Sequence, residues 1–293
     1  MAESEAARPM DGKVCMVTGA TAGIGLVAAS ELAVRGARVI GVGRSQERCG
    51  EAARLIRDQT NGAAVEYLVA DLSSQSEIRR LAQGVKASTG RLDVLLNNAG
   101  GIYLDRQETA DGFERTFAVK HLAYFLLTNL LLDLIKASTP ARIINVSSAA
   151  HKGSKINFDD LQGKTRYSGW RAYQQSKLAN ILFTQELARQ LSGTGVTANA
   201  LHPGFVNTKI FRADGLIGWL LRRSADLFAI SPQQGAKTSV YLATSPEVEN
   251  VTGKYFIKQC VAASSSASQD DAAARRLWEV SEKLTGLPAS SAV

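Results

Sequence analysis

The fold of this chain is decided by the stretch Lys13-Val14-Cys15-Met16-Val17-Thr18-Gly19-Ala20-Thr21-Ala22-Gly23-Ile24-Gly25. It opens with a short apolar run typical of a buried strand, and residues 24–35 then carry apolar side chains at helical spacing. Glycines lack a Cβ, so the turn between strand and helix can be tight and a ligand can approach its backbone. The N–H groups and positive dipole end of the helix favour a pyrophosphate there. We therefore expect dinucleotide binding by Gly19, Thr21, Ala22, Gly23, Ile24 and Gly25.

The same alternation of apolar strand and helix continues along the chain. The expected strands are residues 13–18, 37–42, 65–70, 92–96, 142–146, 196–201 and 254–257. The expected helices are residues 24–35, 46–59, 75–88, 109–136, 170–191, 232–244 and 270–285. Near-continuous apolar strands that alternate with helices are typical of a parallel sheet covered on both faces. The sequence predicts an α/β fold, a Rossmann-type doubly wound parallel sheet of about seven strands with helices on both faces.

No linker or repeat divides the chain, so we expect one domain over residues 1–293, with loose ends at 1–10 and 288–293. The alternation lapses only at 209–230, an apolar stretch that also holds three arginines. We favour a lid over an apolar substrate pocket for this stretch. The alternative is a helix that lies on a membrane surface.

The composition excludes several classes of protein. The 293 residues are 45% hydrophobic and 21% charged, and the net charge of +7 is not gathered in clusters, so nucleic-acid binding is not expected. The three cysteines lack metal-ligand spacing, which predicts no metal site and reduced thiols in the cytoplasm. No signal peptide is evident, and no uninterrupted apolar run approaches the length of a membrane span. Peripheral membrane contact and a homodimer stay open.

A second stretch, Tyr173-Gln174-Gln175-Ser176-Lys177, indicates acid–base chemistry. On a helix, Tyr173 and Lys177 share a face because they are four residues apart. A cation about 4 Å away, at an effective dielectric of about 20, favours the phenolate by about 4 kcal/mol. That would bring the pKa of the tyrosine from about 10 to roughly 7, where general acid–base catalysis works best. Alone, such a pair is more often a solvated surface pair.

The end of the second strand bears on the choice of cofactor. A NAD-preferring site usually has an acidic residue there, which accepts from the ribose hydroxyls. Here the strand ends in Val42-Gly43-Arg44-Ser45, with no acid, so we expect Arg44 to bind a 2′-phosphate and NADP(H) to be preferred over NAD(H). Further along the same edge, Asp71 is expected to hydrogen-bond the adenine, and Asn98 and Gly100 to lie over the ribose.

Taken together, these motifs resemble the short-chain dehydrogenase/reductase family over nearly the whole chain. The matching segments are Thr18-Gly19 with Gly23-Ile24-Gly25, Asp71-Leu72, Asn97-Asn98-Ala99-Gly100, Asn145-Val146-Ser147-Ser148, Tyr173 with Lys177, and Pro203-Gly204. Within the family the chain looks most like the retinol dehydrogenases and their bacterial and plant relatives. That likeness is carried by segments such as His121-Leu122, Phe125-Leu126-Leu127-Thr128, Ala150-His151, Ser176-Lys177-Leu178-Ala179-Asn180 and Gly253-Lys254-Tyr255-Phe256.

The resemblance implies a role for each site residue. Tyr173 would exchange a proton with the substrate oxygen while hydride passes to or from the nicotinamide, and Ser148 would orient that oxygen. Lys177 would lower the pKa of Tyr173 and bind the nicotinamide ribose. The cofactor would also be held at Asp71, Leu72, Asn98, Ala99, Gly100, Pro203, Gly204, Val206 and Thr208. His151 and His202 are expected to be structural.

One position departs from the family pattern. Where the family normally supplies an asparagine before His-Leu, this chain has Lys120, in Ala118-Val119-Lys120-His121. The asparagine is thought to hold a water that links the catalytic lysine to solvent. Lys120 could point away and leave the site impaired, replace the water with its own amine, or add positive potential beside Lys177 at a cost of a few kcal/mol. We expect reduced but not abolished activity.

The sequence thus predicts an NADP(H)-dependent oxidoreductase that interconverts a carbonyl and an alcohol, with a lipophilic or retinoid-like aldehyde or ketone as substrate. One alternative is a catalytically weakened NADP(H)-binding sensor, which only Lys120 supports. Another is a reductase of a carbon–carbon double bond.

Overall fold

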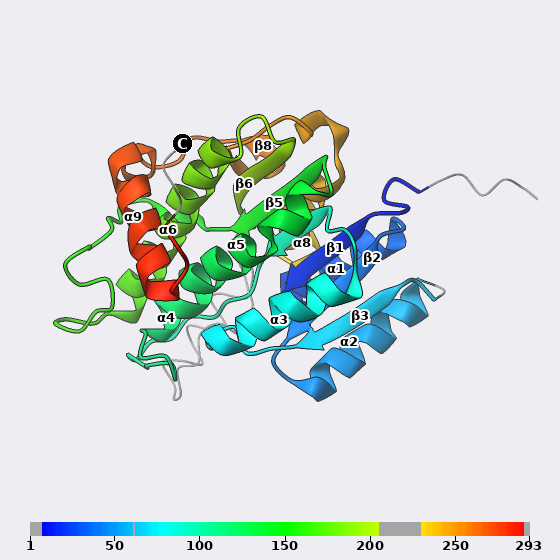
Figure 1. The fold of residues 1–293 in the computed structure, drawn as a ribbon, viewed down its shortest axis with the longest axis horizontal. Helices are drawn as coiled ribbons and strands as arrows, with labels where there is room; N and C mark the ends of the chain where they lie inside the picture. Colours follow the sequence, from blue (N-terminus) through cyan, green and yellow to red (C-terminus); the bar gives the residue numbers. More distant parts are fainter. Residues whose placement is uncertain (1–7, 61, 205–229, 290–293) are drawn as a thin grey trace, which may run out of the picture.

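The computed structural model describes residues 8–60, 62–204 and 230–289 and places its strands in one eight-stranded sheet (Figure 1). The spatial order is β3-β2-β1-β4-β5-β6-β7-β8. The strands are β1 (Val14–Thr18), β2 (Arg38–Gly43), β3 (Val65–Val69), β4 (Val94–Asn97), β5 (Ala141–Val146), β6 (Val196–His202), β7 (Tyr255–Ile257) and β8 (Cys260–Val261). The first seven pair in parallel and β8 alone is antiparallel. The predicted doubly wound fold is confirmed; β8, only two residues long, was not predicted.

The winding of the sheet changes direction beside β1. That strand pairs with β2 on one side and with β4 on the other, so the crossovers to β2 and to β4 leave from opposite faces. In open α/β sheets, ligands bind outside the carboxyl ends of the strands at such a switch point. The turns that follow β1, β4 and β5 therefore border the crevice in which a site is expected.

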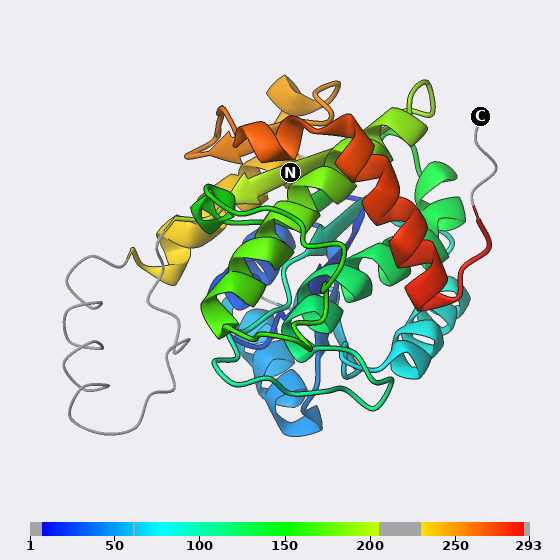
Figure 2. The ribbon, with the colours of Figure 1, turned by 90° about the vertical axis from the view of Figure 1, so that its left-hand side faces the viewer.

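Helices cover both faces of the sheet (Figures 1 and 2). One face carries α1 (Gly23–Val34), α2 (Gln46–Gln59) and α8 (Pro232–Thr244). The other face carries α3 (Gln75–Ser88), α5 (Ala123–Lys136) and α6 (Gly169–Gln190). The last helix, α9 (Asp271–Thr285), packs against α6 and lies beside it in both views. Short 3₁₀ turns occupy Ala149–His151, Pro246–Val248 and Ser266–Gln269.

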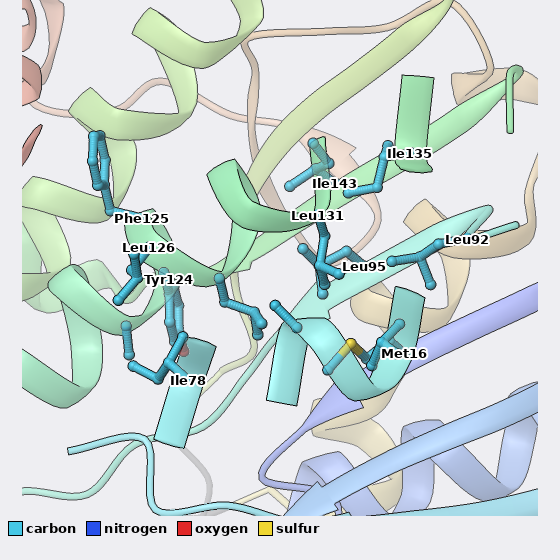
Figure 3. Close-up of a cluster of buried hydrophobic side chains, with 14 of the residues drawn as sticks. Met16, Ile78, Leu92, Leu95, Tyr124, Phe125, Leu126, Leu131, Ile135 and Ile143 are labelled. Carbon is cyan, nitrogen blue, oxygen red and sulfur yellow. The ribbon is translucent and has the colours of Figure 1, made fainter. Parts of the chain in front are cut away.

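Two hydrophobic cores follow from the alternation of side chains along the strands. Met16 of β1 and Leu95 of β4 point into the core beneath α3 and α5, where they meet Leu131 and Ile135 (Figure 3). The intervening residues of the same strands belong to the opposite core, as Val17 does. Because successive side chains of a strand face opposite ways, a strand covered on both faces must be apolar throughout.

The helix predicted over residues 109–136 begins six residues later than expected. Residues 109–114 form a turn, and the Glu114 carboxylate caps the helix by accepting from the backbone N–H groups of Thr116 (2.8 Å) and Phe117 (2.7 Å). After the short α4 (Arg115–Phe117), Ala118–Leu122 form one turn of π-helix, in which Ala123 N–H donates to Ala118 O. Only then does α5 begin. The apolar pattern could not reveal this wider turn, because all five of its residues are buried.

The helical run Arg115–Lys136 also departs from the expectation that nothing in the chain could span a membrane. By length (22 residues) and mean hydropathy (1.4) alone, the run would suffice to cross one. In the fold, 72% of its apolar window is buried, with Leu126, Leu127 and Leu131 in the core against the sheet. Its hydropathy is thus that of a core helix.

Candidate active site

The glycine turn after β1 is packed too tightly for any other residue. Gly19 adopts φ +68°, and a Cβ on it would lie 2.8 Å from Ala99 Cα. A Cβ on Gly25 would lie 2.2 Å from Gly19 O. Contacts that short do not occur in folded proteins, so both positions need glycine. The turn is thereby held against the segment that follows β4.

Three polar side chains fix this packing, and a role in the site was predicted for only one of them, Asn98. Asn98 Nδ2 donates to Thr18 O (2.9 Å), and Thr18 Oγ1 accepts from the backbone N–H of Asn98 (2.9 Å) and of Ala99 (3.1 Å). Tyr124 donates to Ala99 O (2.9 Å). The Asn98 side chain, expected over the ribose, therefore braces the glycine turn with its amide nitrogen. A threonine at a strand end and a tyrosine on an apolar helix were the available signals.

The glycine turn suits a pyrophosphate. Ala22, at the N-terminus of α1, makes no side-chain cap, and the first turn of α1 holds no acidic residue, so its N–H groups are not already bound by a side chain. A helix start of this kind is a ready anion site. At the end of β2, a Cβ on Gly43 would lie 2.4 Å from Thr21 Cγ2. The end of β2 is therefore packed closely against the glycine turn. The residues present fit a dinucleotide.

The neighbouring strand ends hold the other predicted cofactor residues. Arg44 is exposed just after β2, and no acidic side chain follows it before α2. Asp71 Oδ1 accepts from Ser73 N–H (2.9 Å), while Leu72 is buried. Gly204 adopts φ +97° after Pro203. Val206, Thr208 and residues 209–229 of the predicted lid lie outside the described residues.

The predicted catalytic side chains meet where β5 ends and α6 passes over it. Ser148 follows β5, and its Oγ accepts from Ala150 N–H (3.2 Å). Lys177 Nζ donates to Val146 O (2.7 Å), and Ser147 Oγ donates to Lys177 O (2.6 Å), so that β5 and α6 are tied together at this point. The Lys177 amine lies over the Tyr173 ring, 5.9 Å from its centroid. Sequence positions 29 residues apart thus form one site.

Lys120 points into the site rather than away from it. Lys120 is 4% exposed, and its Nζ lies 4.8 Å from the centroid of the Tyr173 ring. The amine also covers Gly100, where an added Cβ would lie 2.7 Å from Nζ. Burial lowers the pKa of Lys120 to about 8. Burial and the charge of Lys120 together hold the pKa of Lys177 well below its usual value.

The expected lowering of the Tyr173 pKa is wrong. Burial raises the pKa of Tyr173, and a hydrogen bond with Ser148 offsets only part of this shift. The expectation assumed a charged Lys177 in a fairly polar setting. In the fold Lys177 is 4% exposed and the ionisation of its amine is opposed, so it supplies less positive charge than assumed.

A small group of polar side chains lies near the carboxyl ends of β5 and β6. His151 has the structural role expected of it, since Nε2 accepts from Ser265 N–H (3.0 Å) and Nδ1 lies 2.6 Å from Ser148 O. Burial lowers the pKa of His202 to about 4, with His151 and Lys177 adding to the shift. The hydroxyl of Tyr255, whose ring stands edge-on to His151, has no hydrogen-bond partner in the part of the chain described. Tyr255 belongs to a segment that carries the family likeness, but no role in the site was predicted for it.

Comparisons with known proteins agree with this geometry. A family model described as short chain dehydrogenase matches residues 13–215. Human retinol dehydrogenase 13 is 45% identical over 293 aligned residues, covering 96% of this chain and 86% of that protein. Human retinol dehydrogenase 11 is 45% identical, covering 95% and 87%.

Solved structures give the same result. An uncharacterised protein of Mycobacterium paratuberculosis is 35% identical, with a TM-score of 0.78 over 96% of this chain and 97% of that one. The NADP active-site complex of Pseudomonas aeruginosa RhlG is 26% identical, with a TM-score of 0.66 over 85% and 96%. The predicted family and its retinol dehydrogenase-like subgroup are confirmed.

Proposed function

This chain belongs to the short-chain dehydrogenase family, whose members use a nicotinamide cofactor, and from that premise we propose an NADP(H)-dependent enzyme that interconverts a lipophilic aldehyde or ketone and its alcohol. The observation that carries the proposal is the meeting of Ser148, Tyr173 and Lys177 beside the glycine turn. A hydroxyl, a phenol and an amine face the crevice there, and no described group of three or more His, Cys, Asp or Glu side chains could hold a metal ion.

Each of these side chains has a defined task. The nicotinamide supplies or accepts a hydride when it is bound. Tyr173 donates its phenolic proton to the carbonyl oxygen in reduction and removes the hydroxyl proton in oxidation. Ser148, whose hydroxyl acts to lower the pKa of Tyr173, orients the substrate oxygen toward the same proton. Lys177 stabilises the phenolate that forms, since charge on its amine offsets the cost of ionising a buried tyrosine.

Two observations support the preference for NADP(H). Arg44 is exposed at the end of β2 and faces no acidic neighbour before α2, so it can meet a 2′-phosphate. One solved relative was determined as an NADP complex. A lipophilic substrate is proposed because the curated relatives are retinol dehydrogenases. A cytoplasmic location is proposed as well, since all three cysteines are free thiols.

The second candidate function is a sensor that binds NADP(H) without turnover. Lys120 is the observation that favours it, because its charge opposes that of Lys177 at the point where the phenolate must be stabilised. The catalytic trio, Ser148, Tyr173 and Lys177, is intact, which favours catalysis.

The test is oxidation of NADPH and of NADH with a panel of retinal, alkyl aldehydes, aromatic ketones and steroids. We expect turnover of at least one aldehyde, faster with NADPH, and a loss of about 10²–10⁴-fold in Tyr173→Phe. Arg44→Ala should raise the KM for NADPH far more than that for NADH. Faster turnover with NADH by the unaltered chain contradicts the role given to Arg44. Tight NADPH binding without turnover of any substrate would favour the sensor.

A further inference from the structure

The proposed function assigns no step to the Lys120 amine. It reaches the site from the π-helical turn Ala118–Leu122 and lies over the Tyr173 ring, 4.8 Å from its centroid. Tyr173, Ser148 and Lys177 already account for the proton, the orienting hydroxyl and the stabilising cation. A buried amine that faces reactive groups therefore calls for its own account.

The surroundings of Lys120 do not neutralise it. Within residues 8–60, 62–204 and 230–289, no acidic side chain lowers the cost of its charge, since burial is the only influence found on its pKa, which falls to about 8. A second amine shares the site, since the charge of Lys120 lowers the pKa of Lys177. Nucleophilic lysines in enzymes are activated by these two conditions, desolvation and a neighbouring cation.

The position of Lys120 suits an attack on a carbonyl. The proposed function places the substrate carbonyl at the hydroxyls of Tyr173 and Ser148, and the Lys120 amine overlies the ring of that same tyrosine. The amine lies next to Gly100, which is exposed. Because Gly100 has no side chain, it does not block the approach of a substrate to the amine from that side.

We propose that Lys120 is a covalent capture site for aldehydes, with which its amine condenses to form an imine. The nitrogen lone pair forms a bond to the carbonyl carbon, and the carbonyl π electrons pass to the oxygen. The two amine protons then leave with that oxygen as water, so that neither an oxidant nor a reductant is needed. This inference rests on the proposed function for the class of substrate, an aldehyde, but needs no turnover.

The free-amine fraction separates Lys120 from ordinary lysines. At pH 7.5, an amine of pKa about 8 is about one-quarter unprotonated, against about 0.1% for an ordinary lysine of pKa about 10.4. Lys136 is the matched comparison, because it lies on the same helical run and is exposed.

The experiment uses the full chain, decanal and sodium cyanoborohydride, which reduces the imine to a stable secondary amine. Intact mass followed by peptide mapping should show one decyl group, on Lys120, formed at least about tenfold faster than any on Lys136. Lys120→Arg should abolish the fast labelling, whereas Lys136→Asn should leave it unchanged. The mapping on the unaltered chain decides the question even if Lys120→Arg fails to fold.

Labelling spread over exposed lysines, with Lys120 unmodified, would overturn the capture site. NADPH oxidation with decanal, measured without cyanoborohydride, tests the proposed function separately. Turnover without labelling of Lys120 contradicts only the capture site. Labelling of Lys120 with no turnover on any substrate would uphold the capture site and contradict the proposed function.

Discussion

Buried charged side chains are paired with opposite charges at one end of the sheet and left without such partners at the other. At the amino end, the Asp93 side chain is 2% exposed and accepts from Lys13 Nζ (3.0 Å), Arg91 Nε (2.8 Å) and the backbone N–H of Val14 (2.9 Å). At the carboxyl end, Lys120 and Lys177 are both 4% exposed, and no acidic partner of either is found among the residues that the structure describes.

The pKa values show the consequence. Burial alone would raise the pKa of Asp93, but the bonds from Arg91, Val14 and Lys13 outweigh it and hold the pKa below its usual value. The two lysines have no such compensation, and burial lowers the pKa of each. A charge that serves stability is paired, whereas a charge that serves chemistry is left uncompensated at a cost in stability.

Removal of the Lys177 amine should have the largest effect on activity and should not lower the stability of the fold. We expect Lys177→Met to lower kcat/KM about 10³-fold, because the Tyr173 phenolate then loses the amine that Val146 O holds beside its ring in a buried site. Unfolding by urea should show a free energy equal to or above that of the unaltered chain, since a buried cation is removed. Lys13→Met, at the opposite end, is the control and should leave kcat/KM unchanged. A similar loss of activity in both variants would refute the contrast.

Removal of the Asp93 charge should act in the opposite sense. We expect Asp93→Asn to lower the free energy of unfolding by about 3 kcal/mol, because two cations lose their buried negative charge and one of the two acceptor oxygens becomes a donor. Activity below the melting temperature should stay unchanged. Asp133→Asn is the matched control, since Asp133 is 93% exposed and lies 3.8 Å from Lys86, and it should cost less than about 1 kcal/mol. Equal effects of the two substitutions would mean that burial of Asp93 does not matter.

The pH dependence of stability should separate Lys120 from Asp93. The folded-state pKa of Lys120, about 8, lies below the unfolded value of about 10.4, so the unfolded chain binds more protons between these values and stability rises with pH there. Lys120→Met should therefore be more stable than the unaltered chain at pH 7, by up to about 3 kcal/mol, and the gap should close from pH 8 to pH 10.

The charge on Asp93 stabilises the fold whereas the charge on Lys120 destabilises it, so stability rises with pH in both cases but over separate pH ranges. The folded-state pKa of Asp93 is depressed, so its contribution is present above the unfolded pKa of about 3.9 and is lost as the pH falls through the folded value. Urea titrations at fixed pH values measure both trends. A gap between Lys120→Met and the unaltered chain that stays constant from pH 7 to pH 10 would show that Lys120 does not titrate in this range.

The smallest expected effect is that of restoring the family's usual residue. Lys120→Asn should raise kcat by less than about tenfold, because it removes the charge that opposes Lys177 without touching the trio. Steady-state kinetics with the best aldehyde of the panel would measure it. No gain in kcat would mean that the lysine is a competent substitute for the asparagine.

The parts of the molecule that could be predicted from the sequence are those that repeat a simple period. Buried strands and their turns follow from apolar runs, and the trio follows from short motifs that end at the same edge of the sheet. The burial of Lys120 could not be predicted, because it depends on a widened helical turn whose five residues are all buried, the polar ones included. The tyrosine pKa was missed for a related reason, since a sequence gives the spacing of two groups but not how dry their surroundings are.

The π-helical turn at Ala118–Leu122 makes the length of this segment a variable as important as its composition. Its hydrogen bond spans five residues where an α-helix spans four, so the turn holds one residue more than a regular helix needs. Deleting that single residue would restore the regular helix and turn every side chain on one side of the deletion by about 100° relative to the other. A deletion of one codon in this segment could therefore remove the Lys120 amine from the site while leaving the codon for lysine intact.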